Sequence, residues 1–141
     1  MWDNIVNPLI RRYYLWFGRF SFFIVYFYFG AIKIFSTSPA GPLVYALHAQ
    51  TIPFIPFQPF YIGFSLFEML IGVLFLIPRF TRVVFVLFIL HMITTTLPLI
   101  ILPSYSWQSA FVPTLDGQYI IKNLILISLA CSILVNTKGK K

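Results

Sequence analysis

The chain has 141 residues, of which 60% are hydrophobic and only 9% are charged. Soluble domains are roughly half apolar and one-quarter charged, so this composition excludes an ordinary soluble protein and indicates a single membrane domain over residues 1–141. The formal net charge is +7, but eight of the ten Lys and Arg residues flank apolar runs. The positive charge is therefore expected to orient the chain in a lipid bilayer, and nucleic acid is excluded as a partner.

Four apolar runs are long enough to cross a hydrocarbon core of ~30 Å at a helical rise of about 1.5 Å per residue. The sequence therefore predicts an all-α fold, an integral membrane bundle of four transmembrane helices. The four spans are expected at about residues 15–35, 60–77, 83–102 and 119–135.

The segments around the first span are also informative. In residues 1–12, apolar side chains lie among polar ones, which predicts a short amphipathic segment on the inner membrane surface. Residues 36–59 contain no charged residue and five prolines. The prolines leave residues 43–51 as a short helix, and the apolar composition predicts that this helix, which carries His48, lies at the membrane interface.

The second span contains a carboxylate, Glu68, near its middle. A charge at that depth costs roughly 3 kcal/mol unless another group pairs with it. Ser65, Glu68 and Gly72 recur at i, i+3 and i+7, so they share one helical face. Small and polar residues in such a row predict that this face packs against neighbouring helices.

In the third span, His91, Thr94, Thr95 and Pro98 share one face. Pro98 cannot donate a hydrogen bond to the carbonyl of Thr94, which predicts a kink. A second outer loop is expected at residues 103–118, before the fourth span.

The fourth span begins at Tyr119, and Lys122 and Asn123 lie one turn inside it. The loops at residues 36–59 and 103–118 lie on the same side of the membrane, and both lack Lys and Arg. Basic residues flank the spans at their opposite ends. The positive-inside rule therefore predicts that both termini are cytoplasmic.

The candidate functional site is an intramembrane polar cluster of Lys33, Glu68, His91, Lys122 and Asn123. From the helical rise, Glu68 lies about 12 Å below the outer boundary with His91 at a similar level, and both lysines lie about 5 Å below it. Two interpretations are open. The cluster either faces a central cavity that opens outward and binds a polar headgroup or relays a proton, or it holds the helices together while both lysines extend toward water.

Other chemistry has less support in the sequence. No catalytic residue is predicted, because there is no Ser-His-Asp arrangement, nucleotide-binding loop or carboxylate pair, and the chain alone is not expected to be an enzyme. A haem is disfavoured, because no second transmembrane histidine matches the depth of His91, and no metal site is predicted. The single cysteine, Cys131, excludes dithiol chemistry on this chain. Secondary candidates for ligand contact are His48, Tyr119, Thr94 and Thr95.

Three stretches resemble the DoxX-like family of small bacterial four-helix membrane proteins: GAIKIF at 30–35, GFSLFEMLIGVLFLIPRFTR at 63–82 and PTLDGQYIIKNLILI at 113–127. The family has a lysine that closes the first helix, a glutamate midway along the second and a Gly-x-Tyr/Phe-x-x-Lys-Asn/Asp start to the fourth. His91 and Pro98 are similar to a His...Thr-x-x-Pro pattern of related sequences. The resemblance covers about residues 18–135, and the family positions are occupied by Lys33, Glu68, Gly117, Tyr119, Lys122 and Asn123.

The resemblance implies a multi-pass protein of the bacterial inner membrane. Some related proteins are subunits of thiosulfate:quinone oxidoreductases, others accompany oxidant-defence complexes, and a distant animal relative is a receptor-assembly chaperone. The resemblance therefore implies that the chain is an accessory or anchoring subunit of a quinone-linked redox complex and has a soluble or membrane redox partner. A homo-oligomer is another candidate assembly. The candidate ligands are a quinone and a lipid. The alternatives are a small-molecule or lipid binding or transport protein with an outward-opening polar cavity, and a membrane assembly factor.

Overall fold

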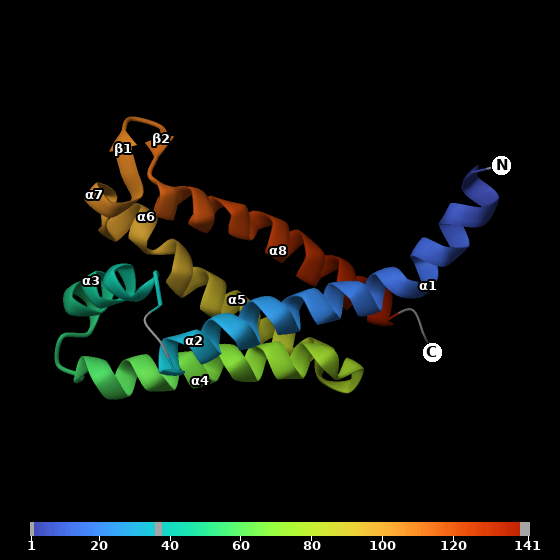
Figure 1. The fold of residues 1–141 in the computed structure, drawn as a ribbon, viewed down its shortest axis with the longest axis horizontal. Helices are drawn as coiled ribbons and strands as arrows, with labels where there is room; N and C mark the ends of the chain where they lie inside the picture. Colours follow the sequence, from blue (N-terminus) through green and yellow to red (C-terminus); the bar gives the residue numbers. More distant parts are fainter. Residues whose placement is uncertain (1, 36–37, 139–141) are drawn as a thin grey trace.

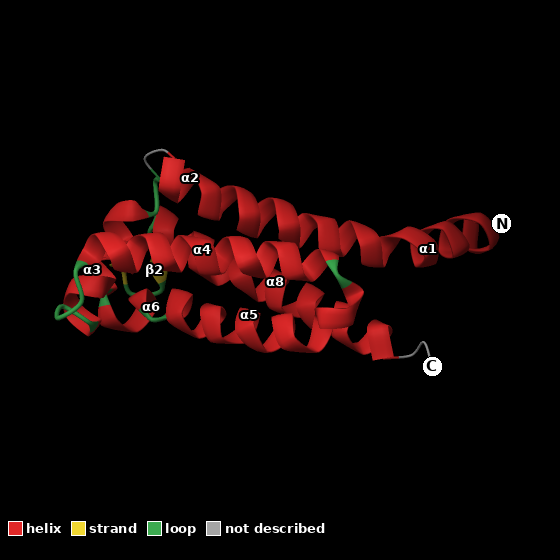
Figure 2. Cartoon of the chain, turned by 90° about the horizontal axis from the view of Figure 1, so that it is seen from below, coloured by secondary structure: helices red, strands yellow, loops and turns green. Residues whose placement is uncertain are grey.

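The computed structural model describes residues 2–35 and 38–138, and it leaves out the side chains of residues 2–9, 11, 12 and 138. Long helical segments run side by side, and the N- and C-terminal segments lie at the same end (Figure 1, Figure 2). We call this the terminal end and the opposite one the loop end. In chain order the elements are α1 (Trp2–Phe23), the π-helix η1 (Ile24–Tyr28), α2 (Phe29–Phe35), α3 (Gly41–Thr51), α4 (Phe57–Leu76), the 3₁₀-helix η2 (Pro78–Phe80), α5 (Thr81–Thr96), α6 (Pro98–Ile101), α7 (Pro103–Ser106), β1 (Trp107–Ser109), β2 (Val112–Pro113) and α8 (Leu115–Lys138).

Four helical segments of the described chain are long and apolar enough to cross a membrane. This confirms the predicted all-α membrane fold with four spans. The short helix expected at residues 43–51 is α3, which begins two residues earlier. The spans of the structure are Tyr13–Phe35, Phe57–Leu76, Pro78–Ile101 and Leu115–Thr137.

Two glycines allow the first and second spans to approach closely. A Cβ atom added to Gly72 would lie 2.8 Å from the backbone nitrogen of Phe27 in the π-helix, and one added to Gly30 would lie 2.8 Å from the carbonyl oxygen of Ser65. Ser65, Glu68 and Gly72 are all buried, which confirms the predicted packing face of the second span. Small residues at these positions therefore determine how near the polar groups of the two helices come.

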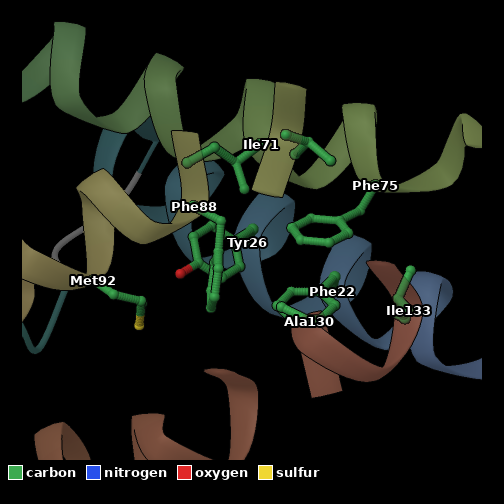
Figure 3. Packing of buried hydrophobic residues seen from close by; sticks show 9 residues of the cluster. Phe22, Tyr26, Ile71, Phe75, Phe88, Met92, Ala130 and Ile133 are labelled. Carbon is green, nitrogen blue, oxygen red and sulfur yellow. The ribbon is translucent and has the colours of Figure 1, made fainter. Parts of the chain in front are cut away.

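Aromatic rings fill the centre of the molecule, as Figure 3 shows. Phe22 of α1 stacks on Phe75 of α4 with ring centroids 3.9 Å apart, and Phe88 of α5 meets both rings edge-on. Tyr26 packs against Phe88 at the loop-end side of this cluster (Figure 3). Edge-to-face contacts are a favoured geometry for aromatic side chains, and these rings pack three spans against one another.

The third span is interrupted where its proline predicts a break. Helix α5 ends at Thr96, and α6 begins at Pro98, which has no N–H to donate. The loop expected at residues 103–118 contains α7 and a small antiparallel hairpin of β1 and β2, and α8 begins within it at Leu115. Hydrogen bonds of Ser106 Oγ to the Pro98 carbonyl (2.9 Å) and of Trp107 Nε1 to the Leu99 carbonyl (3.0 Å) tie the hairpin to α6.

At the terminal end, a buried arginine connects four elements. The guanidinium of Arg19 in α1 donates hydrogen bonds to the carbonyl of Phe75 (2.8 Å) and to the hydroxyls of Thr81 (2.6 Å) and Thr137 (2.9 Å). These acceptors belong to the end of α4, the start of α5 and the end of α8. A buried guanidinium is tolerated because each of these bonds replaces one to water.

Candidate functional site

The carboxylate of Glu68 meets side chains from two other spans. The ammonium of Lys33, at the end of the first span, donates a hydrogen bond to Glu68 Oε2. His91 Nε2, from the third span, lies 3.1 Å from Glu68 Oε1. The side chains of Lys33, Glu68 and His91 are 6%, 8% and 4% exposed, so water does not solvate this group of charges. Each carboxylate oxygen therefore has a partner inside the protein.

Tyr26 extends this arrangement on the far side of the histidine. Its hydroxyl lies 3.2 Å from His91 Nδ1. An ionised carboxylate only accepts hydrogen bonds, so His91 Nε2 carries the proton that it donates to Glu68, and Nδ1 accepts the hydroxyl proton of Tyr26. The result is one hydrogen-bonded series, Tyr26–His91–Glu68–Lys33, which we call the polar relay.

Sequence reasoning missed Tyr26. It precedes Lys33 by seven residues, which is two helical turns, and that spacing places both on one side of the first span. Tyr26 lies within the π-helix η1, which sequence periodicity does not indicate. Single π-turns inside α-helices often occur at functional sites.

Aromatic rings line the relay toward the loop end. The ring of Phe64 stacks on His91 with centroids 5.2 Å apart, and the Lys33 ammonium lies 5.7 Å from the Phe64 centroid. Phe60 stacks in turn on Phe64, and the ring centroids of Phe60 and of His48 in α3 are 4.8 Å apart. His48 Nε2 is buried and has no hydrogen-bond partner among the described residues. A row of rings thus connects α3 with the relay.

The fourth span contributes less to this site than the sequence indicates. Lys122 is exposed, and its ammonium lies 4.8 Å from the ring centroid of Tyr119. No hydrogen bond between described residues joins Lys122 or Asn123 to Glu68. Helix α8 packs mainly against α5 and touches α1 and α7, so it lies away from the helices that carry Lys33 and Glu68.

The hydroxyls of the two threonines near His91 donate hydrogen bonds to carbonyls of their own helix, α5. Thr94 Oγ1 donates to the His91 carbonyl at 2.7 Å, and Thr95 Oγ1 donates to the Met92 carbonyl at 3.0 Å. Bonds of this kind return to the preceding turn of the same helix, so both hydroxyls donate within α5. Among the described residues, no group of three or more His, Cys, Asp or Glu could hold a metal ion.

A pocket of about 720 Å³ reaches the relay from the loop end. Lys33 lines it, so the ammonium that pairs with Glu68 also borders the pocket. The volume lies within the range of small-molecule sites, and the walls combine aromatic rings with a few polar groups, as such sites do. The other walls come from α3, the segment before it and the start of α4, and include Ser38, Tyr45, Phe57, Gln58 and Tyr61.

Comparison with known proteins identifies a family. The model of the DoxX-like family matches residues 23–131. This range contains every residue of the polar relay and the whole of the pocket lining. Comparisons with curated proteins and with solved structures found no match.

Proposed function

The chain belongs to the DoxX-like family of membrane proteins, and on that premise we propose that it is an accessory or anchoring subunit of a quinone-linked redox complex in a bacterial inner membrane. In this proposal a quinone headgroup occupies the loop-end pocket beside Lys33. The observation that carries it is the position of Lys33, which ends a buried relay of protonatable groups and borders a pocket of ligand size. The predicted cytoplasmic termini would place this pocket on the outer side of the membrane.

The chemistry of a quinone suits the walls of this pocket. A quinone is a flat ring with two carbonyl acceptors and an apolar tail. The Lys33 ammonium and the Tyr61 hydroxyl are donors for the carbonyls, and Tyr45 and Phe57 supply aromatic faces for the ring. The tail would extend into lipid.

Reduction of a quinone takes up two electrons and two protons and yields the quinol. A redox partner protein would supply the electrons, whereas Glu68 and His91 provide proton-holding groups directly behind Lys33. The Glu68 carboxylate also holds the Lys33 ammonium at the inner end of the pocket, because an unpaired lysine near a membrane boundary turns toward water.

Binding of decylubiquinone to the purified protein in lipid nanodiscs tests the proposal. We expect saturable binding by the wild-type chain and roughly 5- to 10-fold weaker binding by Tyr61→Phe, because one hydrogen bond of about 1 kcal/mol is lost. Lys122→Met, which alters an exposed lysine outside the pocket, should bind as the wild type does. Equal losses in both variants, or no binding beyond partition into empty nanodiscs, would refute a quinone site.

Co-purification from native membranes tests the accessory role separately. A stoichiometric redox partner supports it. Quinone or lipid binding by a chain without such a partner would favour the binding or transport alternative. Neither a ligand nor a redox partner would favour an assembly factor, with the polar relay serving to hold the spans together.

A further inference from the structure

A second cavity, of about 290 Å³, lies at the terminal end of the molecule. It is separate from the loop-end pocket, and its volume is near the lower limit of small-molecule sites. Arg79 of η2 and Arg82 of the first turn of α5 contribute to it. Its lining consists of Pro78, Arg79, Thr81, Arg82, Leu134 and Thr137.

The walls of this cavity are braced by Arg19. Its guanidinium holds the hydroxyls of Thr81 and Thr137, both of which line the cavity. Because Arg19 is buried and makes three hydrogen bonds, its role here is to position the walls. Among the residues that line the cavity, the exposed Arg79 and Arg82 are the cations available to a ligand.

The charges around the cavity favour an anion. Of the chain's three acidic residues, Glu68 is paired in the polar relay, Asp116 lies in the first turn of α8 at the loop end, and the side chain of Asp3 is outside the described part. Helix α5 begins at Thr81 with no side-chain cap and no acidic residue in its first turn. The positive end of its dipole therefore adds to the charge of the two arginines.

We propose that this cavity binds a phosphate group, carried either by an anionic phospholipid or by a soluble phosphate. Arginine recognises phosphate oxygens through paired N–H donors. Two arginines beside the start of a helix can therefore bind a phosphate group whatever molecule carries it. The inference does not depend on the quinone proposal, since the two cavities share no residue.

Retention of phosphatidylglycerol, measured by native mass spectrometry from detergent micelles that contain phosphatidylglycerol and phosphatidylcholine, tests this site. The double variant Arg79→Gln/Arg82→Gln should bind phosphatidylglycerol roughly 25-fold more weakly, since each arginine that lines the cavity donates to the phosphate, and each lost interaction of about 1 kcal/mol is a fivefold factor. Arg79→Lys/Arg82→Lys should lie in between, because it keeps the charges and loses the paired donors.

The matched control is Arg11→Gln/Arg12→Gln, which makes the same change in net charge elsewhere in the sequence and should retain the lipid. Competition by inorganic phosphate alone would identify a soluble ligand, and its failure to compete would identify the lipid; both outcomes support a phosphate site. Equal loss in the two glutamine double variants, or no loss in either, would overturn it.

Discussion

Replacing Lys33 with methionine is expected to lower the free energy of unfolding by about 3 kcal/mol. The change removes the ammonium that pairs with Glu68 and leaves a carboxylate at membrane depth with His91 as its remaining hydrogen-bond partner. The carboxylate has a short side chain and lies near the middle of its span, so it cannot reach water as a lysine can. Unfolding of the protein by SDS, followed by circular dichroism, measures the loss.

Lys122→Met is the matched control, because it makes the same substitution at an exposed lysine. We expect its unfolding free energy to stay within about 0.5 kcal/mol of the wild-type value. The double variant Lys33→Met/Glu68→Leu should recover most of the loss, since replacing both partners of a buried ion pair with apolar residues is often neutral. Equal destabilisation by the two lysine substitutions would show that the ion pair does not stabilise the fold.

Gly72→Ala is expected to destabilise the protein by about 2 kcal/mol. The added Cβ would lie 2.8 Å from the backbone nitrogen of Phe27, so the π-helix must move away from the second span. Tyr26 belongs to that π-helix, and its hydrogen bond to His91 should lengthen as a result. The same SDS titration measures stability, and the nitrogen chemical shifts of His91 report on the hydrogen bond.

Gly63→Ala provides the comparison on the same helix. A Cβ at Gly63 has no neighbour within 4 Å among the atoms of the described structure, so only helix propensity changes. Alanine is favoured over glycine inside a helix by about 0.5–1 kcal/mol, and this variant should be slightly more stable than the wild type. If both alanine variants lost stability alike, close approach at Gly72 would not be the cause.

The sequence predicts the membrane fold well because the relevant physics is local. Apolar runs of fixed length must span the bilayer as helices, and the break at Pro98 follows from a missing N–H. The sequence also indicates the contact between Glu68 and His91, since the residue count places both side chains at a similar depth in the membrane. Depth along a helix is readable from residue count.

The rotation of each helix about its axis, and which helices pack together, cannot be predicted from residue count. Lys33 and Lys122 have equal expected depths, yet only Lys33 reaches Glu68, because α2 packs on α4 whereas α8 packs mainly on α5. Tyr26 and the π-helix escaped prediction for a related reason. A single wide turn leaves no mark in hydrophobic periodicity, and it lies where Gly72 of the second span meets the backbone of Phe27.

The most direct test concerns the pairing of the buried carboxylate. Solid-state NMR of the protein in lipid, with ¹⁵N-labelled lysine and ¹³C-labelled glutamate, measures the distance between a lysine Nζ and the Glu68 carboxyl carbon, and the Lys33→Met variant assigns the signal. We expect a coupling that corresponds to a separation below about 4 Å and that disappears in Lys33→Met. A separation beyond about 6 Å, or a coupling that survives the substitution, would contradict the proposed ion pair and the relay that depends on it.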